Sequence, residues 1–557
     1  MDRRRTEHDF ARVPSVDIPR SSFNRSHCVK TTFDEGKLVP FFLDEVLPGD
    51  TFDLKATLFA RLATPIVPFM DNVYLDTFFF FVPNRLLWEH WQQFCGQRDH
   101  PQDDPTRLMI PTLTGGATGP MTVVETGTVL DYLGLPVNVT GLTNVSALPC
   151  RAYNLIWNEW FRDENLCDAA EVHFGDGPDH QSHYVLLSRM KRHDYFTSCL
   201  PWPQKGTAPA IPIVGNMPIR TTVTPLQSDG KPFEAGTYPA GYYQPLNYGY
   251  KTSTPWTNTP MYAYTRTATG VANAAIPIMN VYDPSQLTRG PYIDLRGMFA
   301  DPTAQAAVTI NSFRQAFQLQ RLLERDARSG TRYTEVLRAH FGVVSPDARL
   351  QRPEYLGGSS SHLMVHAVEQ NSQTTATTPQ GNLAAFGVFG DTMHGFSKSF
   401  VEHGYIIGLL NVRADLTYQQ GLRRLWSRRS RFDFYWPALA HLGEQLVLNK
   451  EIQASGKPVW DEAGFGYQER WAEYRYFPSQ ITGYMRSNSK TPLDMWHLAQ
   501  DFDDGVVLND VFITEKPPIK RVIAVDKQHH FLFDSYIQLR CTRPMPVYSV
   551  PGLIDHF

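Results

Sequence analysis

The stretch of sequence that decides the fold is TFDLKATLFARL, residues 51–62. Apolar side chains occupy every second position, with polar side chains between most of them: Phe52, Leu54, Ala56, Leu58, Ala60 and Leu62 alternate with Asp53, Lys55, Thr57 and Arg61. A period of two residues places alternate side chains on opposite faces of an extended chain. Residues 51–62 are therefore predicted to form a β-strand with one buried face and one mostly solvated face.

The same alternation returns far along the chain, in residues 406–416 and 531–541. We expect all three strands to lie in one antiparallel β-sandwich, with the two distant ends of the chain meeting in one sheet. Helical patterns follow strands without regular alternation, which disfavours a doubly wound parallel sheet. The fold class expected is therefore mainly β with a few helices.

Three segments show helical spacing of apolar residues. The clearest covers residues 151–163, where Tyr153, Ile156, Trp157, Trp160 and Phe161 form one aromatic stripe. A second is expected from about Asn84, with Leu87, Trp88, Trp91 and Cys95 on one face and Gly96 as its stop. A third is expected to begin near Ser312 and to end at Gly330.

Composition excludes several classes of protein. The 557 residues carry a formal net charge of -4 and are 42% hydrophobic, whereas a disordered chain needs low hydrophobicity and high net charge. The amino terminus shows no apolar signal-peptide region, and the run at residues 78–82 is far shorter than the roughly 18 residues of a membrane span. Six scattered cysteines lack the spacing of a zinc site or a disulfide framework, so we expect reduced thiols packed as small hydrophobes.

Residues 207–289 differ in composition from the rest of the chain. Their 83 residues include 11 Pro, 13 Thr and 8 Tyr but only 8 charged residues. The segment either packs on its own subunit or projects to contact another molecule, and the second interpretation is favoured because low charge with clustered aromatics is typical of interfaces. The candidate contact residues are Tyr242, Tyr243, Tyr248, Tyr250 and Trp256.

Catalytic signatures such as GxxxxGK[ST], GxSxG and HExxH are missing, so no enzyme activity and no cofactor are expected. One group of metal-ligand types remains: His173, Asp176, Asp179, His180 and His183. These residues could gather around a metal ion, or they could form a turn whose carboxylates cap backbone amides. The structural turn is favoured, because one loop rarely supplies every metal ligand.

Two basic segments could contact nucleic acid. The amino-terminal arm, residues 1–45, has a surplus of three positive charges in its first thirty residues, and it is equally consistent with phosphate contact and with a solvated tail. Its candidate DNA-contact residues are Arg3, Arg4, Arg5, Arg12, Arg20 and Arg25. The second segment interleaves Arg423, Arg424, Arg428 and Arg429 with aromatic residues. That mixture suits single-stranded nucleic acid, although subunit contact or structural pairing is favoured.

Long stretches of the chain resemble the major capsid protein of the gokushoviruses, small icosahedral single-stranded DNA phages of the microvirus family. The most distinctive is AYNLIWNEWFRDEN at residues 152–165. The others are residues 30–33, 38–40, 44–51, 70–72, 78–84, 191–197, 204–206, 318–328, 345–358, 413–421, 431–436 and 466–476. Residues 207–289 do not align with the family pattern.

This resemblance implies an eight-stranded antiparallel jelly roll, residues 46–557, with long insertions. It implies a subunit that self-assembles into an icosahedral virion shell around circular single-stranded DNA, after synthesis in the host bacterial cytoplasm. Further partners implied are a small basic internal protein, a minor DNA-pilot protein and a host surface receptor met by the insertion at residues 207–289, with no insertion into a membrane.

Two other classes of function compete with this interpretation. A phage enzyme that degrades surface polysaccharide would need paired acids across a cleft, and a jelly-roll lectin would need a compact sugar site. Assembly into particles separates a capsid protein from both alternatives, which would remain small oligomers.

Overall fold

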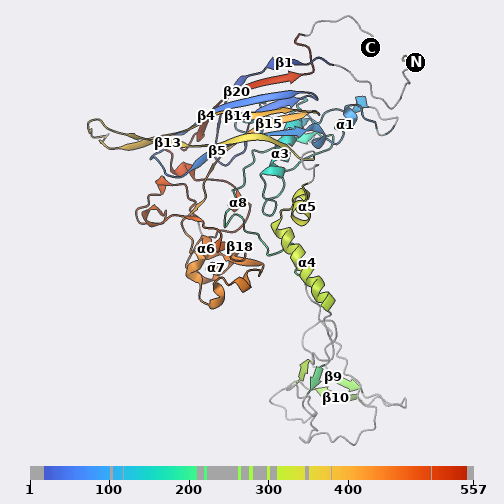
Figure 1. Cartoon of the computed structure of the whole chain (residues 1–557), viewed down its shortest axis with the longest axis vertical. Helices are drawn as coiled ribbons and strands as arrows, with labels where there is room; N and C mark the ends of the chain where they lie inside the picture. The colour runs from blue at the N-terminus through green and yellow to red at the C-terminus, as the bar shows by residue number, and fades with distance from the viewer. Residues whose placement is uncertain are drawn as a thin grey trace, which may run out of the picture. The chain divides into compact units, whose positions relative to one another are not determined.

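The computed structural model describes residues 18–98, 100, 105–116, 118–209, 310–344, 351–377, 379–502 and 505–548, and four short strands between residues 219 and 300. The chain divides into two compact units (Figure 1). Met1–Thr207 and Leu322–Phe557 form the first unit, and Ala208–Arg321 form the second.

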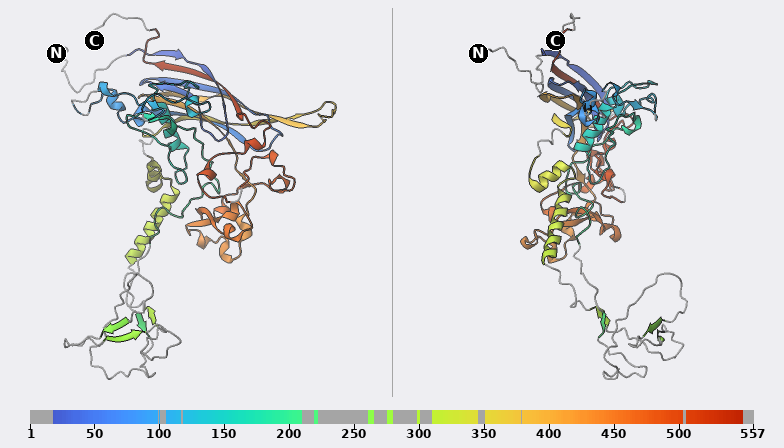
Figure 2. Two further views of the ribbon diagram at one scale, coloured as in Figure 1. Left: turned by 180° about the vertical axis from the view of Figure 1, so that it is seen from behind. Right: turned by 90° about the vertical axis from the view of Figure 1, so that its right-hand side faces the viewer.

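The first sheet is centred on β4, the strand Thr51–Leu62, which pairs antiparallel with β20, Phe531–Arg543. The pairing places Leu54 opposite Leu539, so strands from the two ends of the chain are neighbours in one sheet. The other members of this six-stranded sheet are β1 (Ser21–Asn24), β2 (His27–Phe33), β13 (Met364–Glu369) and β14 (Leu383–Ser399). Figure 2 shows the blue amino-terminal strands beside the red β20.

The second sheet has four antiparallel strands in the order β12-β5-β15-β3. These strands are β3 (Val39–Val46), β5 (Val73–Pro83), β12 (Glu354–His362) and β15 (Gly404–Ala414). β15 is the strand predicted at residues 406–416, although it ends before Leu416. The prediction that all three patterned strands share one sandwich is confirmed.

The two sheets enclose an aromatic core. The Phe79 ring of the second sheet lies 5.6 Å from the rings of Phe41 and Phe396, and Phe41 lies 5.6 Å from Phe533 of the first sheet. Face-to-face packing of antiparallel sheets confirms the mainly β class and is consistent with a jelly roll. The two sheets contain six and four strands rather than the eight expected, because the first sheet's edge is split into β1 and β2 and the chain crosses between sheets from β12 to β13.

The second sheet is buried on both faces. Helix α3, Leu148–Trp160, covers its outer face, and Tyr153, Ile156 and Trp157 pack there with Phe80 of β5. The aromatic stripe of the predicted helix is thus largely confirmed, but Trp160 is 40% exposed and donates its indole N–H to the Pro353 carbonyl at 2.9 Å. Helix α3 ends at Trp160, so that residue lies at the edge of the packed surface.

The helix predicted from Asn84 to Cys95 is wrong as one element. The chain forms a 3-10 turn, η1 (Asn84–Leu86), and the single helical turn α1 (Trp91–Phe94), because Leu87 and Trp88 turn fully into the core between them. The third prediction is confirmed: α4 spans Ile310–Arg328 and precedes Gly330, whose φ is +87°. Helix α5, Tyr333–Phe341, follows.

A third region of the first unit is built from short elements around a small apolar cluster that includes Phe196, Val447 and Phe465. Its elements are β16 (Thr417–Tyr418), β17 (Glu444–Leu448), α6 (Asn449–Ile452), α7 (Pro458–Asp461), β18 (Gly464–Glu469), β19 (Ser479–Gln480) and α8 (Asp510–Ile513). Its 3-10 turns are η6 (Arg424–Ser427), η7 (Arg431–Asp433), η8 (Pro437–Leu439), η9 (Ala472–Tyr474), η10 (Gly483–Met485) and η11 (Asp494–Trp496). The turn η12 (Ile519–Arg521) instead places Ile519 in the sandwich core.

Short elements also connect the sandwich strands: η2 (Pro105–Arg107), β6 (Leu113–Thr114), α2 (Val129–Tyr132), β7 (Asp179–His180) and η3 (Gln181–His183). The second unit contains two strand pairs, β8 (Ile219–Thr221) with β11 (Met298–Ala300), and β9 (Met261–Tyr264) with β10 (Ala275–Met279). No helix within the described ranges has the length and apolarity needed to span a bilayer.

The six cysteines are free thiols, as predicted. Cys150, Cys199 and Cys541 are buried, which agrees with packing as small hydrophobes. Cys28 and Cys95 are exposed, so that part of the prediction is wrong for these two residues. Cys28 lies on an edge strand and Cys95 follows the single turn α1, where no second layer covers them.

Candidate nucleic-acid and subunit interfaces

The amino-terminal arm lies only partly within the described residues. Arg3, Arg4, Arg5 and Arg12 fall outside them. Arg20 donates a hydrogen bond to the Thr51 hydroxyl at 2.7 Å, and Arg25 forms a two-pronged ion pair with Asp44 at 2.5 and 3.0 Å. The charge of Arg25 is therefore balanced within the subunit.

The second basic segment forms a region of exposed aromatic residues and arginines, here called the Arg–aromatic surface. Trp426 is 73% exposed and Phe477 is 66% exposed. The guanidinium of Arg423 lies 4.0 Å from the Phe477 ring centre, and that of Arg431 lies 4.7 Å from the Trp436 ring centre. The surface comprises Arg423, Trp426, Arg429, Arg431, Phe432, Phe434, Tyr435, Trp436 and Phe477.

Two arginines of the same segment are held by acidic residues. Arg424 contacts the buried carboxylate of Glu451 at 3.2 Å and donates to the Leu446 carbonyl at 3.0 Å. Burial raises the pKa of Glu451, and the charge of Arg424 opposes that shift. Arg428 pairs with Glu473 at 3.3 Å. These two contacts agree with the structural pairing favoured for this segment.

A cationic cavity of about 440 Å³ opens beside α3, and the sequence pattern did not reveal it. Arg189 lies 5.2 Å from the Phe78 ring centre and pairs with the buried Asp76 at 2.5 Å. The side chain of Arg192 is 57% exposed at the same place. The lining combines Arg162, Arg189, Lys191, Arg192, His193 and Arg332 with Phe78, Trp160, Phe161 and Tyr355 and one carboxylate, Asp163. The available signal was the basic stretch from Arg189 to His193, but Arg162 and Arg332 come from other segments.

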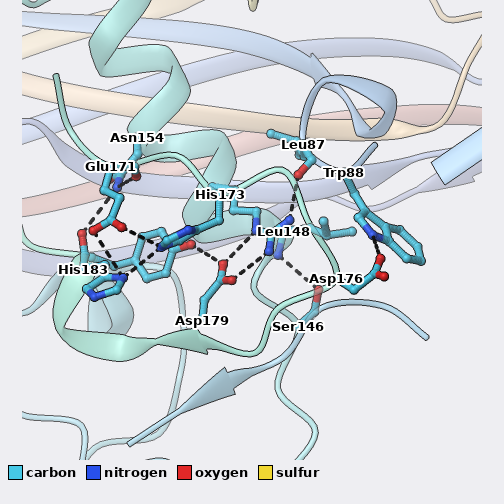
Figure 3. A network of polar contacts seen from close by, with 12 residues as sticks. Leu87, Trp88, Ser146, Leu148, Asn154, Glu171, His173, Asp176, Asp179 and His183 are labelled. Carbon is cyan, nitrogen blue, oxygen red and sulfur yellow. Dashed lines mark hydrogen bonds and ion pairs between the residues drawn. The ribbon is translucent and has the colours of Figure 1, made fainter. Parts of the chain in front are cut away.

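The five candidate metal ligands do not gather at one point, and Figure 3 shows Asp176 beside Trp88, away from His173 and His183. Asp179 is buried and pairs with Arg151 through two 2.7 Å contacts, while Tyr184 donates its hydroxyl to Asp179 at 2.5 Å. Burial acts to raise the pKa of Asp179, but the hydrogen bonds and charge of its partners outweigh it and lower that pKa. Asp179 therefore has a structural role, in agreement with the favoured interpretation of this segment as a structural loop.

Asp176 and His180 also have partners outside the predicted metal group. Asp176 accepts from the Trp88 indole N–H at 2.8 Å and contacts His90 at 2.7 Å. His180 contacts the Ser182 hydroxyl and the Gly115 carbonyl. Only His173 and His183 of the five converge, and they do so with Glu171, which the sequence interpretation omitted.

The whole chain is similar to known phage proteins. The family described as "Capsid protein (F protein)" matches residues 11–553. The chain belongs to this capsid protein family. It is therefore a structural protein of the phage virion, as the sequence resemblance implied, and not an enzyme.

Three relatives of this capsid protein match over almost their full lengths. Capsid protein VP1 of Bdellovibrio phage phiMH2K is 45% identical, with 100% of this chain and 99% of the relative covered. VP1 of Chlamydia phage 1 is 44% identical, and VP1 of Spiroplasma virus 4 is 34% identical, each with 98% of this chain and 97% of the relative covered.

Proposed function

We propose that this capsid protein self-assembles into a small icosahedral shell that encloses a circular single-stranded DNA genome. We also propose that residues 207–289 contribute to attachment to the host. The observation that carries self-assembly is the Arg–aromatic surface, because the exposed aromatic rings Trp426, Phe432 and Phe477 have most of their area uncovered within the subunit. Trp, Tyr, Phe and Arg are the residues enriched at protein interfaces, and this surface presents them together.

The cavity beside α3, where the side chain of Arg192 is 57% exposed, and the unburied cations of the Arg–aromatic surface support the proposal of genome contact. Arg189 and Arg332 of the same cavity are paired with Asp76 and Glu164 within the subunit. Single-stranded nucleic acid is bound by cations that meet phosphates and by aromatic rings on which bases stack. Both features line the cavity beside α3. The proposed partners of the assembled shell are the DNA genome, a small basic internal protein, a minor DNA-pilot protein and a host surface receptor.

Self-assembly is tested by expressing the full chain and examining it by electron microscopy and sedimentation. Particles are expected from the native sequence. The double variant Trp426→Ser and Phe477→Ser should remain folded but sediment as small species, because it removes apolar contact area from the Arg–aromatic surface alone. The matched control is Phe174→Ser, another exposed aromatic outside this surface. Normal assembly of the double variant would contradict the proposal.

Genome contact by the arm is tested with variants in which Arg3, Arg4, Arg5 and Arg12 become Gln. Packaged DNA or particle stability should fall in a salt-dependent way, and each lost phosphate contact should reduce the salt slope by roughly 0.7. Arg25→Gln is the matched control, because Arg25 already pairs with Asp44. Cleavage of the arm by protease on intact particles would contradict an interior arm.

Host attachment is tested by replacing residues 207–289 with a short Gly and Ser linker. Retained assembly with lost adsorption to the host would support the proposal. Retained assembly with normal adsorption would refute it. Single substitutions would then identify the contact residues among the candidates Tyr242, Tyr243, Tyr248, Tyr250 and Trp256. These candidates lie outside the described residues.

A further inference from the structure

Two imidazoles and one carboxylate converge on the loop that follows α3 (Figure 3). His173 Nε2 lies 2.9 Å from His183 Nδ1. The two oxygens of Glu171 reach one ring each, at 3.1 Å from His173 Nε2 and 3.4 Å from His183 Nδ1. Donor atoms of three residues between positions 171 and 183 therefore face one another at 2.9 to 3.4 Å.

The backbone that carries these donors is anchored to the protein core. Asn154 of α3 is buried and donates its side-chain amide to the carbonyls of Glu171, at 2.9 Å, and His183, at 3.4 Å. Between them, Asp179 is held by the fully buried Arg151. One buried amide thus spans both ends of the loop, and a buried ion pair holds its middle. The three donors are preorganised by tertiary structure.

We propose that Glu171, His173 and His183 bind one divalent ion of the zinc class. Two imidazole nitrogens with one carboxylate form a donor set typical of Zn²⁺, whereas Ca²⁺ and Mg²⁺ prefer oxygen ligands throughout. Tetrahedral Zn²⁺ with bonds of about 2.0–2.1 Å would separate its two nitrogens by roughly 3.3 Å, so the observed rings need to part by only a few tenths of an ångström. All three side chains are partly exposed, which leaves a fourth position for water.

The ion would act as a cross-link within the subunit. It joins residue 171 to residue 183 and closes the loop that Asp179 and Asn154 fasten to α3. Because the unfolded chain does not present these donors together, binding stabilises the folded state by an amount that grows with the logarithm of the metal concentration above the dissociation constant. This inference does not depend on the proposed genome enclosure or host attachment.

The test uses the untagged full-length chain, stripped of metal with a chelator, and titrated with Zn²⁺ in a calorimeter. One ion per subunit is expected at this site. The double variant His173→Ala and His183→Ala should bind at least about a hundredfold more weakly, since loss of outer-sphere partners alone commonly costs 10- to 100-fold. His180→Ala is the matched control, because His180 lies on the same loop but contacts Ser182 and Gly115 instead.

Thermal unfolding separates lost binding from lost folding. Zn²⁺ should raise the unfolding midpoint of the native chain and of His180→Ala, but not that of the double variant. Without metal, all three should unfold at similar temperatures, because the substituted rings are partly exposed. An unchanged affinity in the double variant would place the ion elsewhere, for example at Asp34, Glu35 and His530, and would overturn the proposal. Absence of binding to the native chain at micromolar Zn²⁺ would overturn it as well.

Discussion

The sandwich core and the Arg–aromatic surface use the same residue types for opposite purposes. Phe79 and Phe533 are buried between two sheets and contact other rings through their faces and edges. Trp426 and Phe477 are mostly exposed, although an arginine covers the Phe477 ring. Aromatic content by itself thus says little about stability. Its effect depends on whether a second layer of the same subunit covers the ring.

The two regions also differ in how they hold buried charge. The sandwich interior holds a large apolar cluster whose burial stabilises it, and the buried ion pair of the sandwich joins Asp76 of β5 to Arg413 of β15. The region behind the Arg–aromatic surface buries polar and charged groups such as Gln445, Glu451 and Gln468 near a smaller apolar cluster. These groups depend on particular partners, as Glu451 depends on Arg424. We infer that the sandwich supplies most of the subunit's stability, whereas the second region supplies a shaped outer face.

The largest expected difference is between two Phe→Ala substitutions. Phe79→Ala should lower the free energy of unfolding by about 3 to 5 kcal/mol, because it opens a cavity between the sheets. Phe477→Ala should change that free energy by about 1 kcal/mol or less, since the residue is 66% exposed and its contact with Arg423 is worth only about 0.5 to 1 kcal/mol. Urea unfolding of the unassembled subunit would measure both. Equal losses of unfolding free energy would contradict the distinction between the buried sandwich core and the Arg–aromatic surface.

A buried ion pair beside α3 should give the next largest effect. Asp179→Asn should cost about 3 kcal/mol or more in unfolding free energy, because it leaves the Arg151 charge buried without its partner. Asp176→Asn is a matched control and should cost about 1 kcal/mol or less, since Asp176 is half exposed. If the two variants lose the same unfolding free energy, the buried ion pair stabilises the subunit no more than an exposed ion pair does.

A pH effect should come from His530 at the start of β20. Burial opposes the charged ring, but the hydrogen bond and charge of Glu35 and the charge of Asp34 outweigh it and raise the pKa of His530. The stabilisation should therefore be complete below the usual pKa of 6.5 and disappear as pH rises through the raised pKa.

The variant His530→Gln should remove this pH dependence and cost roughly 1 to 2 kcal/mol near the acidic end of the range. Thermal unfolding between about pH 6 and pH 9 would measure the effect, provided that buffers of equal ionic strength are used. A native chain that gains stability through this range would contradict the assigned direction.

The smallest effect is expected from Arg423→Gln on the Arg–aromatic surface. This substitution removes the cation over the Phe477 ring, a contact worth about 0.5 to 1 kcal/mol at an exposed site. Subunit stability should change by no more than that, while particle yield should fall if the surface lies at a subunit contact. A loss of several kcal/mol in subunit stability would show that this surface belongs to the folded core.

Elements whose apolar periodicity lies within one segment could be predicted from the sequence. Elements whose form depends on contacts with distant residues could not. The strands β4, β15 and β20 and the helix α3 carry their own periodicity, so each was predicted close to its observed bounds. The segment 84–95 has helical spacing as well. This segment does not form one continuous helix, because burial of Leu87 and Trp88 outweighs the small free-energy gain of a short helix.

The sequence by itself therefore determined the mainly β class, the pairing of the chain's two ends in one sandwich, and membership in a capsid protein family. Only the tertiary structure decided which polar groups meet. It assigned Asp179 to Arg151 and Asp176 to Trp88, replaced these two carboxylates beside His173 and His183 by Glu171, and gathered arginines from separate segments around the cavity beside α3. The physical reason is that apolar burial is nondirectional and follows local periodicity, whereas ion pairs and metal donors require particular atoms within a few ångströms, and that proximity arises from the fold of distant segments.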